Sequence, residues 1–253
     1  MYRILLIASF IAFSAQAADP ITVDSSARQT AVVELYTSEG CSSCPPADKW
    51  LSKLTETPKQ DLDVLALSFH VDYWNYLGWK DRFSDAAYTK RQRELGANNR
   101  QRTIYTPEFF VNGKESRGAS QILDNIQQVN QQTPKVDLRM TVSREADELV
   151  VALETPTRRD TIGQVHHRYL VYENNLSTEV KRGENSGGTL YHEGVVRYMS
   201  DALGLQASNQ HRIRIDPDWN GENIGVAVMV TSPGDLFYLQ AIHTPVAALT
   251  ASQ

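Results

Sequence analysis

Two cysteines separated by two serines are the residues of this sequence best suited to chemistry. The stretch Cys41-Ser42-Ser43-Cys44 follows a short apolar run and opens a segment with helical spacing of apolar residues. A thiolate at the start of a helix is stabilised by free backbone N–H groups and the helix dipole, which makes it a good nucleophile. The two-residue spacing lets the second thiol attack a mixed disulfide formed by the first. We therefore assign Cys41 as the candidate nucleophile and Cys44 as the candidate resolving thiol.

The same pair could instead be half of a zinc site, or chemically inert. Zinc needs two further ligands, and the sequence contains no second Cys-x-x-Cys and no His-x₃₋₅-His to supply them. Covalent haem is excluded because Pro45, not histidine, follows Cys44. A bridge this short adds little stability, since stabilisation grows with the length of the loop that is closed. Thiol–disulfide chemistry without a metal or cofactor is the favoured interpretation.

A second candidate element is Tyr105-Thr106-Pro107, where a proline opens a predicted strand at residues 108–111. Proline is tolerated at the start of a strand or on a sheet edge, and it can carry a cis peptide bond. The simplest interpretation is an edge-strand proline. A functional one is that the backbone of Thr106 and Pro107 pairs with an extended substrate segment and brings its cysteine to the nucleophile.

Topology favours the functional interpretation. The predicted strands at residues 31–36 and 62–69 are joined by a helix, so they should run parallel and end at the same sheet edge. If the strand after the proline runs antiparallel to them, its start lies at that edge too. Cys41, His70 and Pro107 would then converge.

The chain up to about residue 131 alternates between strand and helix patterns, which predicts an α/β layer domain over residues 28–131. Asn112-Gly113 is a strong hairpin signal, and Ser84 is a plausible helix N-cap. The predicted helices cover residues 47–55, 84–95 and 120–131.

A polar segment at residues 127–134 reads as a linker, and beyond it the apolar period changes to two. Seven strand-like stretches separated by Gly- and Asn-rich turns predict an all-β, sandwich-like domain over residues 135–253. These stretches are residues 136–142, 148–154, 168–172, 194–198, 211–215, 224–230 and 237–242.

Composition and the N-terminus restrict the class of protein. The chain has 253 residues, 41% of them hydrophobic, and 25 basic against 30 acidic side chains, a formal charge of −5. Nucleic acid is excluded as the main partner, because phosphate contacts need clustered Lys and Arg. Residues 1–17 combine Arg3, a short apolar run and Ala15-Gln16-Ala17, which indicates a signal peptide rather than a membrane anchor. We expect a periplasmic or secreted protein with no membrane span after cleavage.

The strand–Cys-x-x-Cys–helix order, together with residues 105–114, resembles the thioredoxin superfamily, especially its extracytoplasmic, oxidase-like branch. More narrowly, residues 39–48, 68–74 and 182–185 resemble an uncharacterised family of secreted bacterial proteins with a thioredoxin-like domain and a β-rich tail. The resemblance implies the cysteine pair and a cis-proline as site residues, but no known substrate.

Two departures from the superfamily pattern concern the surroundings of the cysteines. Pro45 and Pro46 follow the second cysteine, so missing N–H donors would delay the regular helix and weaken the dipole argument. Gly40 stands before Cys41, where many relatives place an aromatic residue.

Glu34 and His70 are auxiliary candidates. In thioredoxin-like proteins a buried acid near Glu34 assists proton transfer to the resolving cysteine, and burial would raise its pKa; the alternative is an edge carboxylate that reaches water. His70 ends a strand beside an aromatic-rich segment. It could activate Cys41, bind a metal with the thiols, or cap a packed aromatic cluster.

Three functions compete. The first is a thiol–disulfide oxidoreductase acting on cysteine-containing exported proteins with an external redox partner. The second is a copper-binding protein or metallochaperone using Cys41, Cys44 and His70, since thiolates select Cu(I). Against it, none of the four methionines falls near the pair. The third is a non-catalytic binding module. The first leads, with its direction of reaction open.

Overall fold

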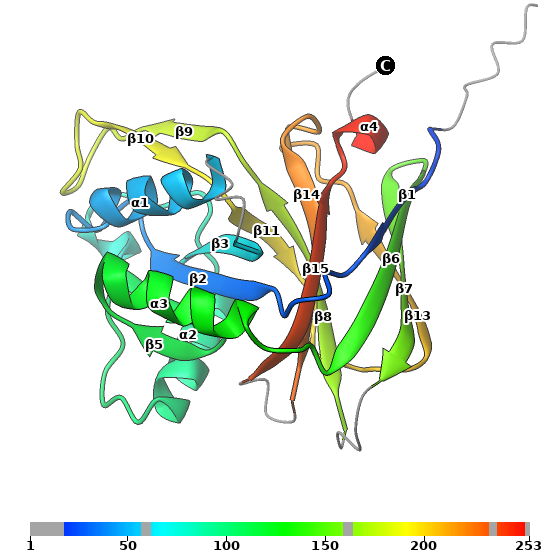
Figure 1. Ribbon diagram of the computed structural model, residues 1–253. Helices are drawn as coiled ribbons and strands as arrows, with labels where there is room; N and C mark the ends of the chain where they lie inside the picture. Colours follow the sequence, from blue (N-terminus) through cyan, green and yellow to red (C-terminus); the bar gives the residue numbers. More distant parts are fainter. Residues whose placement is uncertain (1–17, 57–61, 159–163, 233–236, 251–253) are drawn as a thin grey trace, which may run out of the picture.

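A computed structural model describes residues 18–56, 62–158, 164–232 and 237–250. The predicted signal peptide at residues 1–17 lies outside the described residues. The described chain is a mixed α/β fold, rich in strands, with few helices and several sheets (Figure 1), which confirms the coarse expectation.

The helices are α1 (Pro45–Glu56), α2 (Ala86–Asn98), α3 (Gly118–Asn130) and the short α4 (Ala247–Thr250), with a 3₁₀ turn at Asn75–Leu77. The strands of the first half are β1 (Ile21–Asp24), β2 (Ala31–Thr37), β3 (Val64–His70), β4 (Glu108–Val111) and β5 (Lys114–Ser116). Those of the second half are β6 (Val136–Glu145), β7 (Glu148–Arg158), β8 (His166–Glu173), β9 (Leu176–Glu179), β10 (Thr189–His192), β11 (Val195–Met199), β12 (Leu203–Gly204), β13 (Ser208–Arg214), β14 (Ile224–Thr231) and β15 (Tyr238–Pro245).

One nine-stranded sheet runs through both halves of the chain. Its order is β15-β14-β8-β11-β3-β2-β4-β5, and β12 pairs with β8 off this path. As predicted, β2 and β3 are parallel and β4 is antiparallel to β2. The two halves meet where β11 pairs in parallel with β3, Val195 opposite Ser68. The predicted α/β and all-β segments therefore share one sheet.

Gly194 makes this junction possible. Its φ is +62°, and a Cβ atom there would press into the backbone of Ala66. The carbonyl oxygen of Gly194 accepts the N–H of Ser68 at 2.8 Å, and the Ser68 hydroxyl donates to the Glu193 carbonyl oxygen at 3.1 Å. A glycine therefore lets the second half of the chain approach the edge of β3 closely.

Three apolar cores hold the layers together. Helices α1 and α3 cover one face of β2, β3 and β4, packing Leu51 and Ile126 against Val33 and Leu35. Helix α2 covers the other face, in a core that also contains residues of β8, β11, β14 and β15. The third core fills the space between the β8–β14–β15 part of the large sheet and a four-stranded sheet of order β1-β6-β7-β13. The second core thus joins the halves by side-chain packing as well as by strand pairing.

The predicted N-cap of the second helix and the predicted start of the linker are wrong. The N-cap of α2 is Asp85, whose Oδ1 accepts the N–H of Ala87 at 2.7 Å, while the Ser84 hydroxyl donates to the Asp81 carbonyl oxygen instead. The start of the predicted linker, residues 127–130, belongs to α3. There Asn130 donates to the carbonyl oxygens of Gln29 and Asp63, so a polar side chain that reads as linker anchors the helix end.

Strands β1, β9 and β10 have no counterpart among the predicted strands. Strand β1 pairs with β6 at the edge of the four-stranded sheet. Strands β9 and β10 form a separate two-stranded hairpin that packs beside α1 (Figure 1). Their position depends on tertiary contacts, which apolar alternation in short segments does not reveal.

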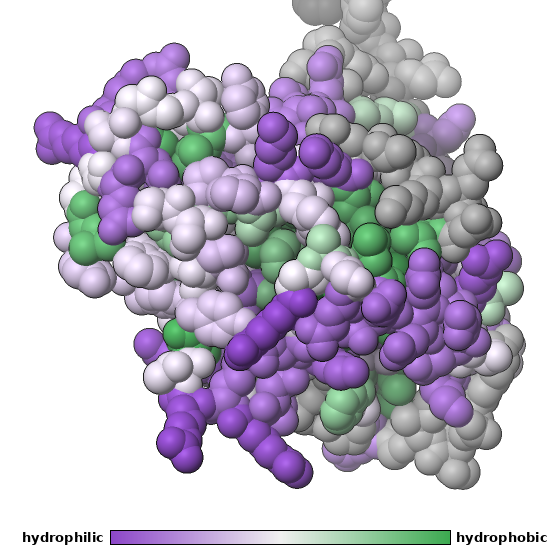
Figure 2. All heavy atoms as spheres, turned by 60° about the vertical axis from the view of Figure 1, so that its left-hand side comes forward, coloured by the Kyte–Doolittle hydropathy of each residue, from purple (hydrophilic) through white to green (hydrophobic). Residues whose placement is uncertain are grey.

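The surface is mostly polar. Viewed from the side that carries α1 and α3, hydrophilic side chains predominate and hydrophobic ones lie in separate groups (Figure 2). Among the described residues, no helix is both long and apolar enough to cross a membrane.

Candidate functional site

The cysteines form a disulfide between the end of β2 and the start of α1, with their Cα atoms 5.4 Å apart. Cys41 is 2% exposed and Cys44 is fully buried, whereas the two serines between them are exposed. Helix α1 begins at Pro45, and the first helical N–H, that of Ala47, donates to the Cys44 carbonyl oxygen at 2.8 Å. The prolines occupy positions whose N–H groups would have no helical partner, so they begin the helix rather than delay it.

The loop before β4 reaches the disulfide. The sulfur of Cys41 lies 3.8 Å from the carbonyl oxygen of Thr106, and the Thr106–Pro107 peptide bond is cis. The indole N–H of Trp74 donates to the Thr106 hydroxyl at 2.7 Å, and the Gln92 amide donates to the Tyr105 carbonyl oxygen at 2.7 Å. The predicted approach of the proline loop to Cys41 is therefore present.

Trp74 also explains the glycine before Cys41. A Cβ atom at Gly40 would lie 3.2 Å from the Cβ of Trp74 and 3.4 Å from its carbonyl oxygen, tighter than ordinary contact. The aromatic side chain near Cys41 is therefore supplied by the segment after β3 instead of by position 40.

His70 is fully buried at the end of β3, and its side chain is engaged with Asp81. Its Nδ1 lies 2.7 Å from Asp81 Oδ2, and that oxygen also accepts the Glu39 N–H at 2.9 Å. Burial opposes a charge on the ring, but the Asp81 carboxylate prevails and raises the pKa of His70 above its usual value. The same interaction, against the cost of burial, lowers the pKa of Asp81.

Glu39 and His192 extend this arrangement. The ring of His192 lies 4.9 Å from that of His70, and its Nε2 is 3.4 Å from Glu39 Oε1, an ion-pair distance without hydrogen-bond geometry. Trp79 donates to the other Glu39 oxygen at 2.7 Å. Despite burial, the interaction with His192 helps to lower the pKa of Glu39.

Asp48 is the buried acid closest along the chain to Cys44. It follows Cys44 by one helical turn, its N–H donates to the Cys44 carbonyl oxygen at 3.1 Å, and the Thr37 hydroxyl donates to its Oδ2 at 3.2 Å. Its Oδ1 is buried without a hydrogen-bond partner. Burial raises the pKa of Asp48, against the attraction of His192 and His70. We refer to Glu39, Asp48, His70, Asp81 and His192 as the buried ionic cluster.

Glu34 has different surroundings. Its carboxylate, fully buried, is bound by both Nε (2.8 Å) and an NH₂ group (3.1 Å) of Arg91, and it accepts hydrogen bonds from the hydroxyls of Tyr36 and Tyr238. Burial raises the pKa of Glu34, but the charge of Arg91 and the hydrogen bonds from Arg91, Tyr238 and Tyr36 together outweigh burial and lower that pKa. Since Tyr238 belongs to β15, this group links the two halves of the chain. Its contacts favour a structural role for Glu34.

The loop between β9 and β10 touches the cysteine motif from the second half of the chain. The carboxylate of Glu184 accepts the N–H of Ser42 at 3.0 Å, and the Asn185 amide donates to the carbonyl oxygens of Glu39 (2.9 Å) and Cys41 (3.0 Å). Sequence reasoning assigned no role to Asp48, Glu184 or Asn185. The signals for them in the sequence are the resemblance motifs at residues 39–48 and 182–185, which contain all three, and the spacing of Asp48 from Cys44, four positions and so one helix face.

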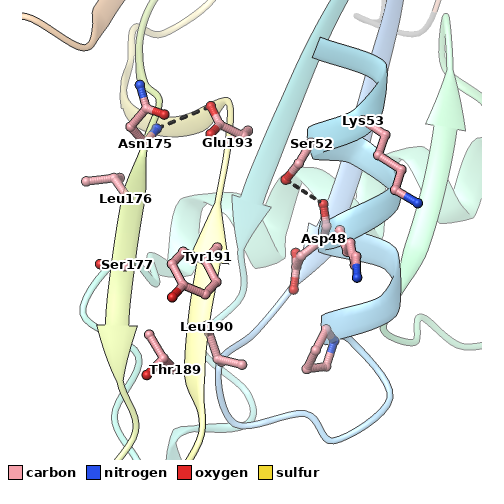
Figure 3. A pocket seen from close by; sticks show the side chains of 12 residues that line it. Asp48, Ser52, Lys53, Asn175, Leu176, Ser177, Thr189, Leu190, Tyr191 and Glu193 are labelled. Carbon is pink, nitrogen blue, oxygen red and sulfur yellow. Dashed lines mark hydrogen bonds between the residues drawn. The ribbon is translucent and has the colours of Figure 1, made fainter. Parts of the chain in front are cut away.

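A cavity of about 650 Å³ opens between α1 and the β9–β10 hairpin, beginning at Pro45 beside the disulfide. Asp48 and Ser52 point from α1 toward the hairpin, and Tyr191 stands on the opposite wall (Figure 3). Tyr191 is 69% exposed. The cavity gives solvent a route to the edge of the buried ionic cluster.

No group of three or more His, Cys, Asp or Glu side chains in the described part of the chain is placed to hold a metal ion. The copper alternative requires Cys41, Cys44 and His70 as ligands. In this structure the two cysteines form a disulfide, and His70 Nδ1 is hydrogen-bonded to Asp81.

Fold and site together define a mixed α/β protein with a Cys-x-x-Cys disulfide between a strand and a helix, next to a cis-proline loop. Residues 32–231 match the family model described as "Protein of unknown function (DUF1223)", and the chain belongs to that family. No curated protein matches the chain.

Two solved structures are similar to the chain. One is the crystal structure of a protein from Agrobacterium tumefaciens, 25% identical, with a TM-score of 0.62 over 89% of this chain and 97% of that one. The other is HBP35 of Porphyromonas gingivalis, 17% identical, with a TM-score of 0.67 over 90% of this chain and 79% of that one. At 17% identity the second likeness shows the fold alone.

Proposed function

We propose that the protein is a thiol–disulfide oxidoreductase that acts on exported, cysteine-containing proteins through Cys41 and Cys44. The observation that carries this proposal is the position of the disulfide, between β2 and α1, with the Cys41 sulfur 3.8 Å from the carbonyl oxygen that precedes Pro107. A bond that closes a loop this short contributes little to stability, so exchange chemistry accounts better for its presence.

The finer fold assignment is part of the proposal. We regard the first half as a thioredoxin-like domain, supported by the β3-β2-β4-β5 order, by the pair of helices on one face and α2 on the other, and by the cis-proline loop. The predicted signal peptide supports action in the periplasm or outside the cell, where disulfides persist.

The exchange consists of two sulfur transfers. In the reducing direction, the Cys41 thiolate attacks one sulfur of a substrate disulfide and forms a mixed disulfide with it. The other substrate sulfur leaves as a thiolate. The Cys44 thiolate then attacks the Cys41 sulfur, the second substrate thiolate leaves, and the Cys41–Cys44 bond forms. Two electrons pass from the cysteine pair to the substrate. The reverse sequence oxidises a substrate dithiol, and in both directions an external thiol or disulfide partner resets the pair.

Several groups support these steps. The Thr106 carbonyl oxygen is placed beside Cys41, where it can accept an N–H from an extended substrate segment. Asp48, with its raised pKa and unpartnered Oδ1, is the candidate acceptor for the Cys44 proton, and His70 and His192 lie close enough to affect its charge.

Equilibration of the purified protein with glutathione, with metal analysis in parallel, tests this function. We expect reversible oxidation of one dithiol at a potential between roughly −120 and −270 mV and no bound metal at stoichiometric level. Stoichiometric copper that is lost in Cys41→Ser, without exchange activity, would support the metallochaperone instead. A protein with neither property would be a binding module.

A further inference from the structure

We infer that Glu184, carried by the loop between β9 and β10, is a positioning residue that disfavours the Cys41 thiolate and so makes the cysteine pair more reducing. This inference rests on the proposed function and specifies how the second half of the chain controls the site.

The Glu184 carboxylate contacts the cysteine motif directly. The carboxylate of Glu184 accepts the N–H of Ser42, the residue directly after Cys41, at 3.0 Å. Hydrogen bonds from Ser42 lower the pKa of Glu184, so the side chain is negatively charged at neutral pH. A negative charge is therefore held at the peptide unit that follows the nucleophile.

Hydrogen bonds from Asn185 hold the loop between β9 and β10 against the cysteine motif. The side-chain amide of Asn185 donates to the carbonyl oxygens of Glu39 at 2.9 Å and Cys41 at 3.0 Å, so it bridges both sides of Gly40. Within the loop, the Val180 N–H donates to the Gly188 carbonyl oxygen at 2.9 Å and the Gly187 N–H donates to the Val180 carbonyl oxygen at 2.8 Å, which closes it into a compact turn. The loop is thus tied to the cysteine motif at two adjacent residues.

The negative charge of Glu184 disfavours a thiolate on Cys41. A thiolate on Cys41 would be a second negative charge on the residue next to Ser42, whose N–H binds the Glu184 carboxylate, and like charges disfavour ionisation. The Ser42 N–H, which could otherwise turn its positive end toward the thiolate, is already used by the carboxylate. The Ser43 hydroxyl can donate to the Cys41 sulfur, since its oxygen lies 3.3 Å away. When the thiolate is less stabilised, the reduced form is less stable relative to the disulfide, so the reduction potential of the pair is lower.

Two variants separate the effect of the Glu184 charge from that of the loop's hydrogen bonds. Glu184→Gln removes the charge but keeps an acceptor oxygen, whereas Asn185→Ala removes the hydrogen bonds to the carbonyl oxygens of Glu39 and Cys41. Glu179→Gln is the matched control, because Glu179 is an exposed glutamate of β9 paired with Lys181 instead of the cysteine motif. Alkylation of Cys41 by iodoacetamide against pH, in a Cys44→Ser background, reports the thiolate fraction without requiring catalysis. Glutathione equilibration of proteins with both cysteines reports the potential.

We expect Glu184→Gln to raise the thiolate fraction at pH 7 roughly threefold. The exchange equilibrium should move in the same direction, toward the dithiol. Both effects should disappear in 1 M salt, because the carboxylate is exposed and screened. Asn185→Ala should give a smaller change in the same direction, and Glu179→Gln none.

An unchanged alkylation profile in Glu184→Gln, or a shift that persists in 1 M salt, would overturn the inference while leaving the proposed function intact. A wild-type protein that does not exchange with glutathione would overturn the proposed function. The alkylation profile would still decide whether Glu184 acts on Cys41.

Discussion

The sulfur of Cys41 lies 3.8 Å from the carbonyl oxygen of Thr106, although 65 positions separate the two residues in the chain. The approach follows from strand directions: β2 ends just before Cys41, and β4, antiparallel to it, begins just after Pro107. When a substrate sulfur reacts with Cys41, the substrate backbone beside that sulfur would therefore lie within hydrogen-bonding reach of the Thr106 carbonyl oxygen.

Thr106→Val should slow exchange with a disulfide-containing peptide roughly fivefold, because it removes the 2.7 Å bond from Trp74 that fixes the Thr106 residue. Stopped-flow measurement of peptide reduction by the dithiol form checks this. Reaction with dithiothreitol, which needs no backbone pairing, should be nearly unchanged. An equal loss with both substrates would show that Thr106 acts on Cys41 itself and not on substrate placement.

Asp48→Asn should slow the resolution of the mixed disulfide at least tenfold, because Cys44 loses its proton acceptor. Burial raises the pKa of Asp48, so the native state binds its proton more tightly than the unfolded state and wild-type stability falls as pH rises above about 4. The neutral variant should therefore be more stable at pH 7 by about 1 kcal/mol, a gain that vanishes near pH 4. Rapid-quench kinetics and urea unfolding measure the two effects.

Ser52→Ala is the control for that variant, since the Ser52 hydroxyl contacts only the backbone carbonyl of Asp48. If Asp48→Asn resolves mixed disulfides at the wild-type rate, the proton acceptor lies elsewhere.

Glu34→Gln should destabilise the protein by about 3–5 kcal/mol, because it leaves the Arg91 guanidinium buried without its counter-charge. Tyr36→Phe, which removes one of the hydrogen bonds to that carboxylate, should cost about 1 kcal/mol. Urea unfolding measures both. The redox potential of the cysteine pair should stay the same. A changed redox potential in a well-folded Glu34→Gln protein would show that Glu34 affects the cysteine chemistry.

The His70–Asp81 pair should give stability a defined pH window. The raised pKa of His70 means that its contribution is complete below about pH 6.5 and is lost as pH rises through the raised value. The lowered pKa of Asp81 means that its contribution is present above about pH 4 and is lost as pH falls through the lowered value. The stability gap between wild type and His70→Gln, about 3 kcal/mol at pH 5–6, should therefore narrow toward pH 9. A gap that widens with pH would contradict this assignment.

Much of the first half could be predicted because its signals are local. Buried strands at β2 and β3, the turn at Asn112-Gly113 and the proline before β4 each have a distinct sequence pattern, and strand direction follows from the connecting helix. The meeting of Cys41 with Thr106 is a consequence of that topology.

The rest depends on contacts that sequence spacing does not encode. Glu34 meets Tyr238 across 204 positions and Ser42 meets Glu184 across 142. The β11–β3 pairing depends on a backbone approach at Gly194. Asp81 and His192 are polar but buried, because Asp81 pairs with His70 and His192 lies beside Glu39, and a pattern of hydrophobic residues cannot show this.

In the proposed mechanism, Cys41 attacks a substrate disulfide and Cys44 resolves the mixed disulfide. Mass spectrometry of the reduced Cys44→Ser and Cys41→Ser proteins, each mixed with a disulfide-containing peptide, tests it most directly. We predict that Cys44→Ser accumulates a stable mixed disulfide through Cys41, while Cys41→Ser forms none at comparable rate because its remaining thiol is fully buried. Failure of Cys44→Ser to form the adduct, or formation of it only through Cys44, would contradict the account.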